Sequence, residues 1–345
     1  VVRRCALPEA PRGVLRYGTA CPAGTLSRQQ ELSLDPVIFF FILGLFAGFA
    51  KADLRFPPAI YDLLSTLLLL TIGLKGGVEL AKSPFAGLLP QVLLVLAMGF
   101  LLPLVVYPLT RVVGRLGRED GASIAAHYGS VSVATYAVGV SFLADRSVAY
   151  DSQLPLFLVL LEVPAIMVGI LLARGLSNRS QWGALAHEVL LGKSIVLLVG
   201  GLLIGWASGP VAIEPLAPLF FDLFKGLLAL FLLEMGLIAA SQAHALRQHG
   251  LFLMAFGVLM PVPMAAVGAV LGWSMGLNPG GTTLLAVLAG SASYIAAPAA
   301  MRIAVPGANP SLSLTASLGV TFPFNIFVGI PLYYSFAEWL HRAGG

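Results

Sequence analysis

The chain has 345 residues, of which 58% are hydrophobic and only 10% are charged, and its formal net charge is +4. An ordinary soluble domain carries about 25% charged residues, so this composition excludes a soluble globular protein and predicts an all-α integral membrane protein. The basic residues stand at the ends of apolar segments and not on one face, which argues against nucleic-acid binding. Cys5 and Cys21 are the only cysteines, so neither a disulfide framework nor a cysteine-based metal site is expected.

Apolar segments long enough to cross a bilayer recur along almost the whole chain. A transmembrane helix needs about 20 predominantly apolar residues. Ten segments meet this requirement: 36–53, 58–80, 85–112, 120–144, 151–175, 186–207, 215–240, 249–276, 280–303 and 311–338. Residues 1–34 are rich in arginine and lack the apolar region of a signal peptide, so we expect a disordered tail or an over-extended gene start there.

The first five segments are repeated by the second five. Equivalent residues follow in chain order: Gly44 and Gly201, Gly48 and Gly205, Pro58 and Pro218, Asp62 and Asp222, Gly99 and Gly257, Pro103 and Pro261, and Pro164 and Pro323. The two residues of each pair are about 160 positions apart. This predicts one five-span repeat over 35–176, a linker over 177–185 and a second repeat over 186–340. An odd number of spans per repeat gives the halves opposite orientations, an inverted repeat that is common among transporters.

Basic residues are concentrated in every second connection. The connections after the first, third, fifth, seventh and ninth spans include Arg55, Arg115, Arg179, Arg247 and Arg302. The positive-inside rule places these connections, and with them the 177–185 linker, in the cytoplasm. Both termini are therefore expected on the periplasmic side of a bacterial inner membrane.

Two short polar patches interrupt the fourth and ninth spans at equivalent positions. They are Gly129-Ser130-Val131-Ser132 and Gly290-Ser291-Ala292-Ser293. Irregular backbone at membrane depth is tolerated only where protein or water satisfies its polar groups, and paired interruptions are a pointer to a transporter's substrate site. Ser132 and Ser293 are placed to cap the helices that follow, whose N-termini favour an anion. The alternative is that the small residues only allow close helix packing.

Glu162 is an acidic residue in the middle of the fifth span, two residues before Pro164. An ionisable residue at membrane depth is costly and is a candidate functional group. Because Pro164 frees a backbone carbonyl nearby, a carboxylate at this place suits a hard cation such as sodium. A proton-carrying role requires only the carboxylate and stays open. His127 and Tyr128 precede the first interruption and are further candidates to line a cavity, and no metalloprotease, nucleophile-elbow or P-loop motif accompanies them.

Four stretches of the chain together resemble the sodium-dependent bicarbonate transporter family. They are Leu70–Gly77, the Gly129–Ser132 patch, Glu162–Ala165 and Ala304–Ser311. The resemblance implies ten spans in two inverted five-helix repeats, a core domain and a gate domain, and a homotrimer. It also implies that the broken fourth and ninth spans cross and hold bicarbonate, with sodium bound nearby. The candidate substrate-binding residues are then Gly129, Ser130, Ser132, Gly290, Ser291 and Ser293.

Two features of the chain depart from the family pattern. Cyanobacterial members carry an acidic residue directly after the second serine cluster, where this chain has Tyr294. The candidate coupling-ion residues are therefore Glu162 and Tyr294, with one carboxylate fewer than expected. The resemblance names a small regulatory protein of the PII type as a candidate partner, although the short 177–185 linker leaves little room for a regulatory insertion.

The sequence thus predicts a secondary active transporter and not an enzyme. The favoured hypothesis is sodium-coupled symport of bicarbonate, or a similar small anion, into the cell, with sodium as coupling ion and no organic cofactor or bound metal. A proton-coupled organic-anion carrier is the alternative that Tyr294 suggests. A membrane sensor or enzyme that keeps the fold without transport is the third.

Overall fold

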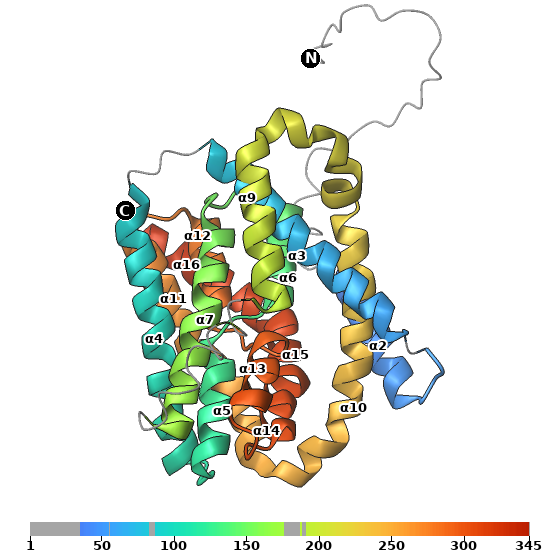
Figure 1. The fold of residues 1–345 in the computed structure, drawn as a ribbon, viewed down its shortest axis with the longest axis vertical. Coiled ribbons are helices and arrows are strands. Elements are labelled where there is room, and N and C mark those ends of the chain that lie inside the picture. The colour runs from blue at the N-terminus through green and yellow to red at the C-terminus, as the bar shows by residue number, and fades with distance from the viewer. Residues whose placement is uncertain (1–34, 55, 83–86, 176–186, 188–190, 345) are drawn as a thin grey trace, which may run out of the picture. The chain divides into compact units, whose positions relative to one another are not determined.

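A computed structural model describes residues 35–54, 56–82, 87–175, 187 and 191–344 of the chain. Regular structure in these residues is entirely helical (Figure 1). Seven of the helices in them are long and apolar enough to cross a membrane, and the chain is described below as a multi-pass membrane protein. The predicted tail, 1–34, and the predicted linker, 177–185, lie outside the described residues.

The main helices follow one another with short connections. They are α2 (Pro36–Phe49), α3 (Pro58–Ala81), α4 (Leu88–Val112), α5 (Arg118–Gly129), α6 (Val133–Asp145), α7 (Leu154–Arg174), α9 (Lys193–Ile213), α10 (Phe224–Leu259), α11 (Pro261–Ser274), α12 (Pro279–Ala289), α13 (Ala296–Ala304), α14 (Pro310–Leu314), α15 (Phe322–Phe324) and α16 (Ile330–Ala343). Single 3₁₀ and π turns, Glu214–Leu216 and Pro218–Asp222, lie between α9 and α10.

Three of the predicted spans differ from a single long helix. The first, α2, has only 14 residues. The fourth and ninth are each divided into two short helices, α5 with α6 and α12 with α13. The last span, by contrast, runs without a break from Pro310 to Ala343. It widens into π-helical turns at Thr315–Thr321 and Asn325–Gly329, on either side of Pro323, whose missing N–H interrupts regular α-helical bonding.

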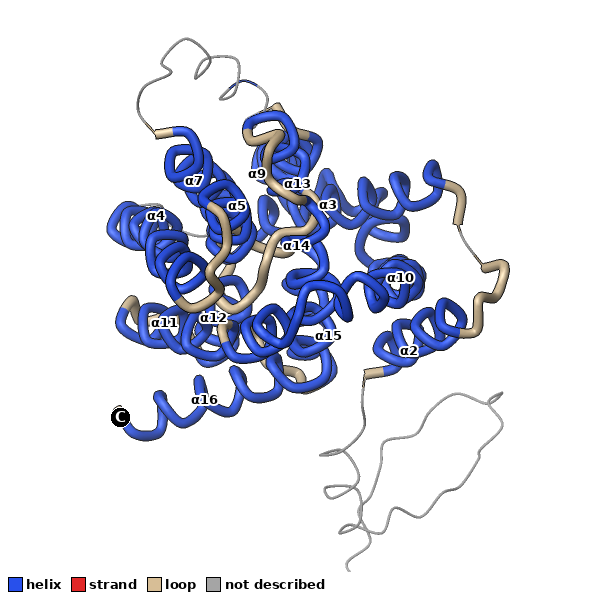
Figure 2. Tube along the Cα trace, turned by 90° about the horizontal axis from the view of Figure 1, so that it is seen from below, coloured by secondary structure: helices blue, strands red, loops and turns tan. Residues whose placement is uncertain are grey.

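Glycines bring α2 against α10 and α3 against α9 at backbone contact. A Cβ on Gly44 would overlap the Leu233 carbonyl oxygen of α10, and one on Gly205 would overlap the Leu74 carbonyl oxygen of α3. Small residues of this kind allow transmembrane helices to approach closely. Figure 2 shows α2 lying beside α10, as these contacts require. The repeated glycines of the first and sixth spans therefore allow the same close approach in both helix pairs.

The other spans form two similar groups of three. Helix α5 packs on both α4 and α7, and α12 packs on both α11 and α16. The half-helix α6 crosses to α12, so the two groups meet where the divided spans approach each other. This contact positions the two predicted interruptions.

Candidate functional site

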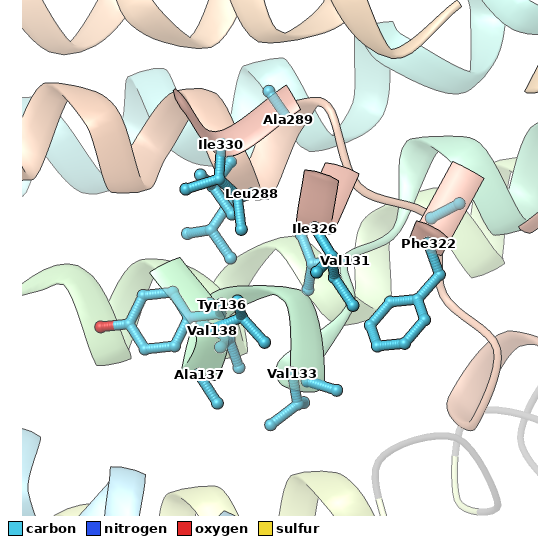
Figure 3. Close-up of a cluster of buried hydrophobic side chains, with 14 of the residues drawn as sticks. Val131, Val133, Tyr136, Ala137, Val138, Leu288, Ala289, Phe322, Ile326 and Ile330 are labelled. Carbon is cyan, nitrogen blue, oxygen red and sulfur yellow. The ribbon is translucent and has the colours of Figure 1, made fainter. Parts of the chain in front are cut away.

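The two interruptions are short stretches of irregular backbone between half-helices. The first runs from the end of α5 at Gly129 to the start of α6 at Val133, with Ser130 extended. The second runs from the end of α12 at Ala289 to the start of α13 at Ala296. Ser130, Ser132, Ser291 and Ser293 are all buried. Figure 3 shows Val131 and Val133 of the first interruption among buried side chains of the last span and of α12.

Each interruption begins with a glycine that packs against a proline-bearing helix. A Cβ on Gly129 would lie 2.6 Å from Pro103 Cδ of α4, and one on Gly290 would lie 2.9 Å from the Pro261 carbonyl oxygen of α11. Interiors packed this tightly do not accept an added methyl group without strain. Pro103 and Pro261 were an equivalent pair in the sequence repeat, so the packing that holds the two glycines repeats as well.

Backbone N–H groups of each interruption donate to the other divided span. The Ser132 N–H donates to the Ser291 hydroxyl at 2.9 Å, and the Ser293 N–H donates to the His127 carbonyl at 2.8 Å. The structure therefore brings the predicted serines of the fourth and ninth spans into one cluster.

Ser132 caps α6, as the sequence predicted, whereas the N-cap of α13 is Ile295 and not Ser293. The Ser132 hydroxyl accepts from the Thr135 N–H at 3.1 Å, and the Ser293 hydroxyl accepts from the Ala297 N–H at 3.1 Å. A side-chain oxygen at the N-cap satisfies one of the N–H groups that a helix start leaves unpaired.

The other two serines tie the interruptions to backbone carbonyls. The Ser130 hydroxyl donates to the Glu162 carbonyl of α7 at 3.1 Å. The Ser291 hydroxyl donates to the Leu288 carbonyl at 2.9 Å. These hydroxyls hold the irregular backbone in place, and backbone N–H groups are left as the main donors toward a ligand.

Four N–H groups remain at the starts of α6 and α13. The first N–H groups of a helix have no partner within that helix. In α6 the Val133 and Ala134 N–H groups are therefore left without a partner, and at the start of α13 those of Ile295 and Ala296 are. Each helix start also carries about half a positive charge from its dipole. The two starts face a common space, because Val133, Ile295 and Ala296 line the same small cavity. This arrangement favours a small anion.

The small cavity also holds Glu162 and Tyr294. Its volume is about 10 Å³, and it is lined by Val131, Ser132, Val133, Glu162, Ser293, Tyr294, Ile295 and Ala296. The Glu162 Oε2 and the Tyr294 hydroxyl are buried without a hydrogen-bond partner among the described residues. An unpaired charge in such a place is very unfavourable, so Glu162 requires either a proton or a cation. The cavity has room for one water molecule, so the described conformation is closed around the site.

Asn325 fixes the second interruption and was not singled out by the sequence. Its side-chain amide donates to the Gly290 carbonyl at 2.9 Å and accepts from the Tyr333 hydroxyl at 2.7 Å. All three residues are buried. The available signal was an amide side chain in an otherwise apolar span, which is uncommon unless it bonds to backbone or to another helix.

His127 and Tyr128 do not line the small cavity. The Tyr128 hydroxyl bonds to the Thr321 hydroxyl at 2.7 Å, and its ring packs edge-on against Phe256. The His127 Nδ1 lies 2.7 Å from the Ser123 carbonyl oxygen, and the ring lines a separate, larger cavity. The two residues therefore support the first interruption from the side of α5.

Ile295 separates three cavities around the interruptions. It lines the small cavity, a second one of about 150 Å³ between α7, α9 and α13, and a third beside Ser65 and Phe231. The 150 Å³ cavity begins at Lys193, the first residue of α9. A path from the end of α9 thus stops at Ile295, next to the helix starts.

Comparison with known families agrees with the motifs and with the helical architecture. The family model of the Na⁺-dependent bicarbonate transporter superfamily matches residues 36–338, from the first residue of α2 into α16. A comparison with curated proteins gives no match. The matched region includes both interruptions, Glu162 and the 304–311 stretch. The chain therefore belongs to the Na⁺-dependent bicarbonate transporter superfamily.

Proposed function

We propose that this protein is a secondary active transporter that carries bicarbonate, or a similar small anion, into the cell together with sodium. The observation that carries the proposal is the meeting of two half-helix starts at one cavity that also holds an unpartnered carboxylate. Family membership supports the same substrate class. We place the protein in a bacterial inner membrane with both termini periplasmic, following the distribution of basic residues.

The anion site is proposed at the two interruptions, with Gly129, Ser130, Ser132, Gly290, Ser291 and Ser293 forming it. Their hydroxyls and close packing hold the backbone so that the first N–H groups of α6 and α13 face the anion. Donors of this kind bind small anions at many helix N-termini without a basic side chain. The carboxylate of Glu162 lies across the same cavity, where it repels an anion unless its own charge is balanced.

The coupling-ion site is proposed at Glu162 and Tyr294. Sodium prefers oxygen ligands, as other hard cations do, and these residues supply the unpartnered Glu162 Oε2 and a phenol oxygen that lies close to the Ser132 side chain. A sodium ion there balances the Glu162 charge and adds positive potential beside the anion. Binding of each ion then favours binding of the other, which is the thermodynamic requirement for symport.

The helix contacts support a division into two domains that move against each other. We assign α2, α3, α9 and the first part of α10 to a gate domain, because glycines join these helices in pairs. The two groups of three helices form the core domain. The repeated Gly–Pro packing at Gly129 and Gly290 supports the inverted repeat, and a homotrimer follows from the family resemblance. In this scheme Ile295 closes the cytoplasmic path while the core carries both ions.

Uptake of labelled bicarbonate into liposomes that contain the purified protein tests the proposal. We expect an inward sodium gradient to stimulate uptake over a potassium gradient of equal strength, and Glu162→Gln to abolish the stimulation. Glu79→Gln is the matched control, because Glu79 is exposed and pairs with Lys82 at the end of α3. Equal uptake with the two gradients would contradict sodium coupling.

A proton-coupled anion carrier is the second candidate, and Tyr294 is the observation that favours it. With a phenol in place of a second carboxylate, Glu162 can be neutralised by one proton alone. The same liposomes distinguish the candidates, since a proton-coupled carrier loses uptake when a protonophore is added and is indifferent to sodium.

A further inference from the structure

The cavity beside His127 has a volume of about 170 Å³ and is distinct from the small cavity of the proposed transport site. It is bounded by α5, α13, α14 and the connection between the last two helices, and it is lined by Ser123, His127, Arg302, Ala308, Ser313 and five apolar or proline neighbours. None of these residues lines the small cavity at the interruptions. The positive-inside rule assigns the α13–α14 connection to the cytoplasm, so this cavity opens on that side.

The connection that covers this cavity is held against α5 by specific contacts. The Asn309 N–H donates to Asp120 Oδ1 at 2.7 Å, and a Cβ on Gly307 would overlap the Glu119 carboxylate. The Asn309 side chain caps α14 by accepting from the Ser311 N–H at 3.0 Å. The distinctive 304–311 stretch therefore builds a wall of this cavity, a role that the transport site does not explain.

His127 offers this cavity a hydrogen-bond acceptor and not a donor. Its Nδ1 contacts the Ser123 carbonyl oxygen at 2.7 Å, and because a carbonyl only accepts, the ring proton must sit on Nδ1. In the neutral ring Nε2 is then an acceptor. The ring is 1% exposed, and Nε2 has no hydrogen-bond partner among the described residues. A ligand that contacts the ring there has to bring a proton donor.

Positive charge and hydroxyl groups complete the cavity. Arg302 lines it as an exposed residue, and no ion pair of Arg302 occurs in the part of the chain that the structure describes. The Ser123 and Ser313 hydroxyls are hydrogen-bonded to each other at 3.3 Å, and the Ser313 hydroxyl also donates to the Pro310 carbonyl at 3.4 Å. Both bonds are long, so the Ser123 hydroxyl can exchange its bond to Ser313 for one to a ligand oxygen. Glu119 and Asp120, the nearest acidic residues on α5, do not line the cavity.

We infer that this cavity binds a monovalent oxyanion that retains an O–H group, such as hydrogen carbonate. Arg302 supplies positive charge beside the charged oxygens, the Ser123 hydroxyl donates to one of them in place of Ser313, and the ligand O–H is the donor that the buried His127 Nε2 lacks. The lining of the cavity by itself supports this chemical class of ligand. That the ligand is also the transported anion rests on the proposed function. Since the His127 carbonyl also accepts from the Ser293 N–H, this second site adjoins the second interruption.

Protection of a cysteine in the cavity wall tests the inference. Ala308→Cys is placed in a Cys5→Ser, Cys21→Ser background and labelled with a small thiol reagent in detergent, at about pH 8, where an imidazole of ordinary pKa is neutral. Hydrogen carbonate should slow labelling at least about threefold, whereas nitrate, a planar monoanion without an O–H, should not. Equal protection by both anions, or by neither, overturns the inference.

Variants separate this site from the transport site. Arg302→Gln and His127→Gln should each remove the protection, and Arg342→Gln, an exposed arginine of α16, should leave it intact. Ser132→Ala should also leave it intact. Loss of protection in Ser132→Ala with retention in Arg302→Gln would place the effect at the interruptions and overturn the inference. Protection without sodium-driven uptake would instead refute only the proposed function.

Discussion

The hydroxyl of Ser291 accepts a hydrogen bond from the backbone N–H of Ser132 at 2.9 Å. This contact joins the divided fourth span to the divided ninth span, 159 residues apart in the chain. It also occupies the first N–H of the α6 start, so that the next two N–H groups are the ones left for an anion. The bond therefore sets both the spacing of the two helix starts and the donors that they present.

Ser291→Ala removes the acceptor and leaves the buried Ser132 N–H unpaired. An unsatisfied buried donor costs about 1–3 kcal/mol, so we expect the KM for anion uptake to rise by about 5- to 150-fold. Uptake kinetics in liposomes measure the change. Ser335→Ala is the control, because Ser335 is exposed and its hydroxyl donates only to the Pro331 carbonyl. An unchanged KM in Ser291→Ala would show that the two interruptions are held together by other contacts.

Gly129→Ala and Gly290→Ala should both destabilise the protein. The added Cβ of Gly129 meets Pro103 Cδ at 2.6 Å, and that of Gly290 meets Ala265 Cβ at 2.8 Å. Overpacking of this kind costs about 1–3 kcal/mol, which thermal unfolding in detergent detects as a lower Tm. Gly200→Ala, in α9 with no atom within 4 Å of its added Cβ, should be neutral or raise the Tm. A fall in Gly200→Ala equal to that of the other two would remove the packing explanation.

Asn325→Leu should loosen the second interruption. It leaves the Gly290 carbonyl and the Tyr333 hydroxyl without their partner, at a cost of about 1–3 kcal/mol for each buried group left unpaired. We expect a lower Tm together with a raised KM for the anion. Tyr333→Phe keeps the bond between Asn325 and Gly290, so its effect on KM should be clearly smaller. The reverse order would show that Asn325 does not position the interruption.

Ile295→Ala should widen the connection between the 150 Å³ cavity at Lys193 and the interruptions. Ile295 lines three cavities, and Ala134 lines the one beyond it. In a background without the native cysteines, Ala134→Cys should therefore react faster with a small polar thiol reagent in inside-out vesicles when Ile295 is alanine. Ile303→Ala, an exposed position of α13, should not change the rate. Equal rates in the two variants would exclude Ile295 as the barrier.

Asp151 should make stability decline as pH rises through the acid range. Although the predicted fifth span began at residue 151, the helix of that span begins at Leu154, so Asp151 lies in the connection between α6 and α7, where it accepts from the Asn278 N–H at 3.0 Å. Burial raises the pKa of Asp151 above its usual value of 3.8, although that hydrogen bond opposes the shift. Because the folded state then binds the proton more tightly than the unfolded state, its contribution is largest below 3.8 and is lost as pH rises through the raised pKa.

Asp151→Asn isolates this contribution. The amide oxygen can still accept from the Asn278 N–H, but it carries no charge to be desolvated. We compare the Tm of the two proteins from about pH 4 to pH 7. The Tm of the variant should decline less with rising pH than that of the wild-type protein. At neutral pH the variant should be at least as stable as the wild-type protein. A wild-type Tm that rises relative to the variant over this range would contradict the assignment.

Much of the fold could be predicted because its signals are local. Hydrophobic length indicates spans wherever a helix must cross a bilayer, and the paired Gly–Ser patches mark the places where α5 and α12 end. N-capping of α6 by Ser132 was equally predictable, since a cap involves residues only a few positions apart. The expected cap by Ser293 was wrong, because α13 starts only after Ile295. The short first helix and the π-helical last span were not predicted, because their lengths and turns depend on neighbouring helices.

The structure brings the predicted serines together, but it gives some of them hydrogen bonds that were not predicted. Ser130 and Ser291 were expected to offer hydroxyls to an anion, whereas in the structure their hydroxyls donate to the carbonyls of Glu162 and Leu288. The part played by Asn325 was not predicted, since nothing local links it to Gly290. Such roles depend on partners that lie 32 and 35 residues away in the chain for Ser130 and Asn325.

The sequence by itself determined that this protein is a helical membrane protein whose apolar segments carry two paired Gly–Ser interruptions and an acidic residue at Glu162. Those properties follow from hydrophobicity, repetition and the backbone preferences of glycine, serine and proline, which each residue carries wherever it lies. Only the tertiary structure decided that Glu162 and Tyr294 share one small cavity with the starts of α6 and α13, and that His127 faces another. Such juxtapositions arise from packing between distant helices, where close contact at Gly129 and Gly290 selects which polar groups meet.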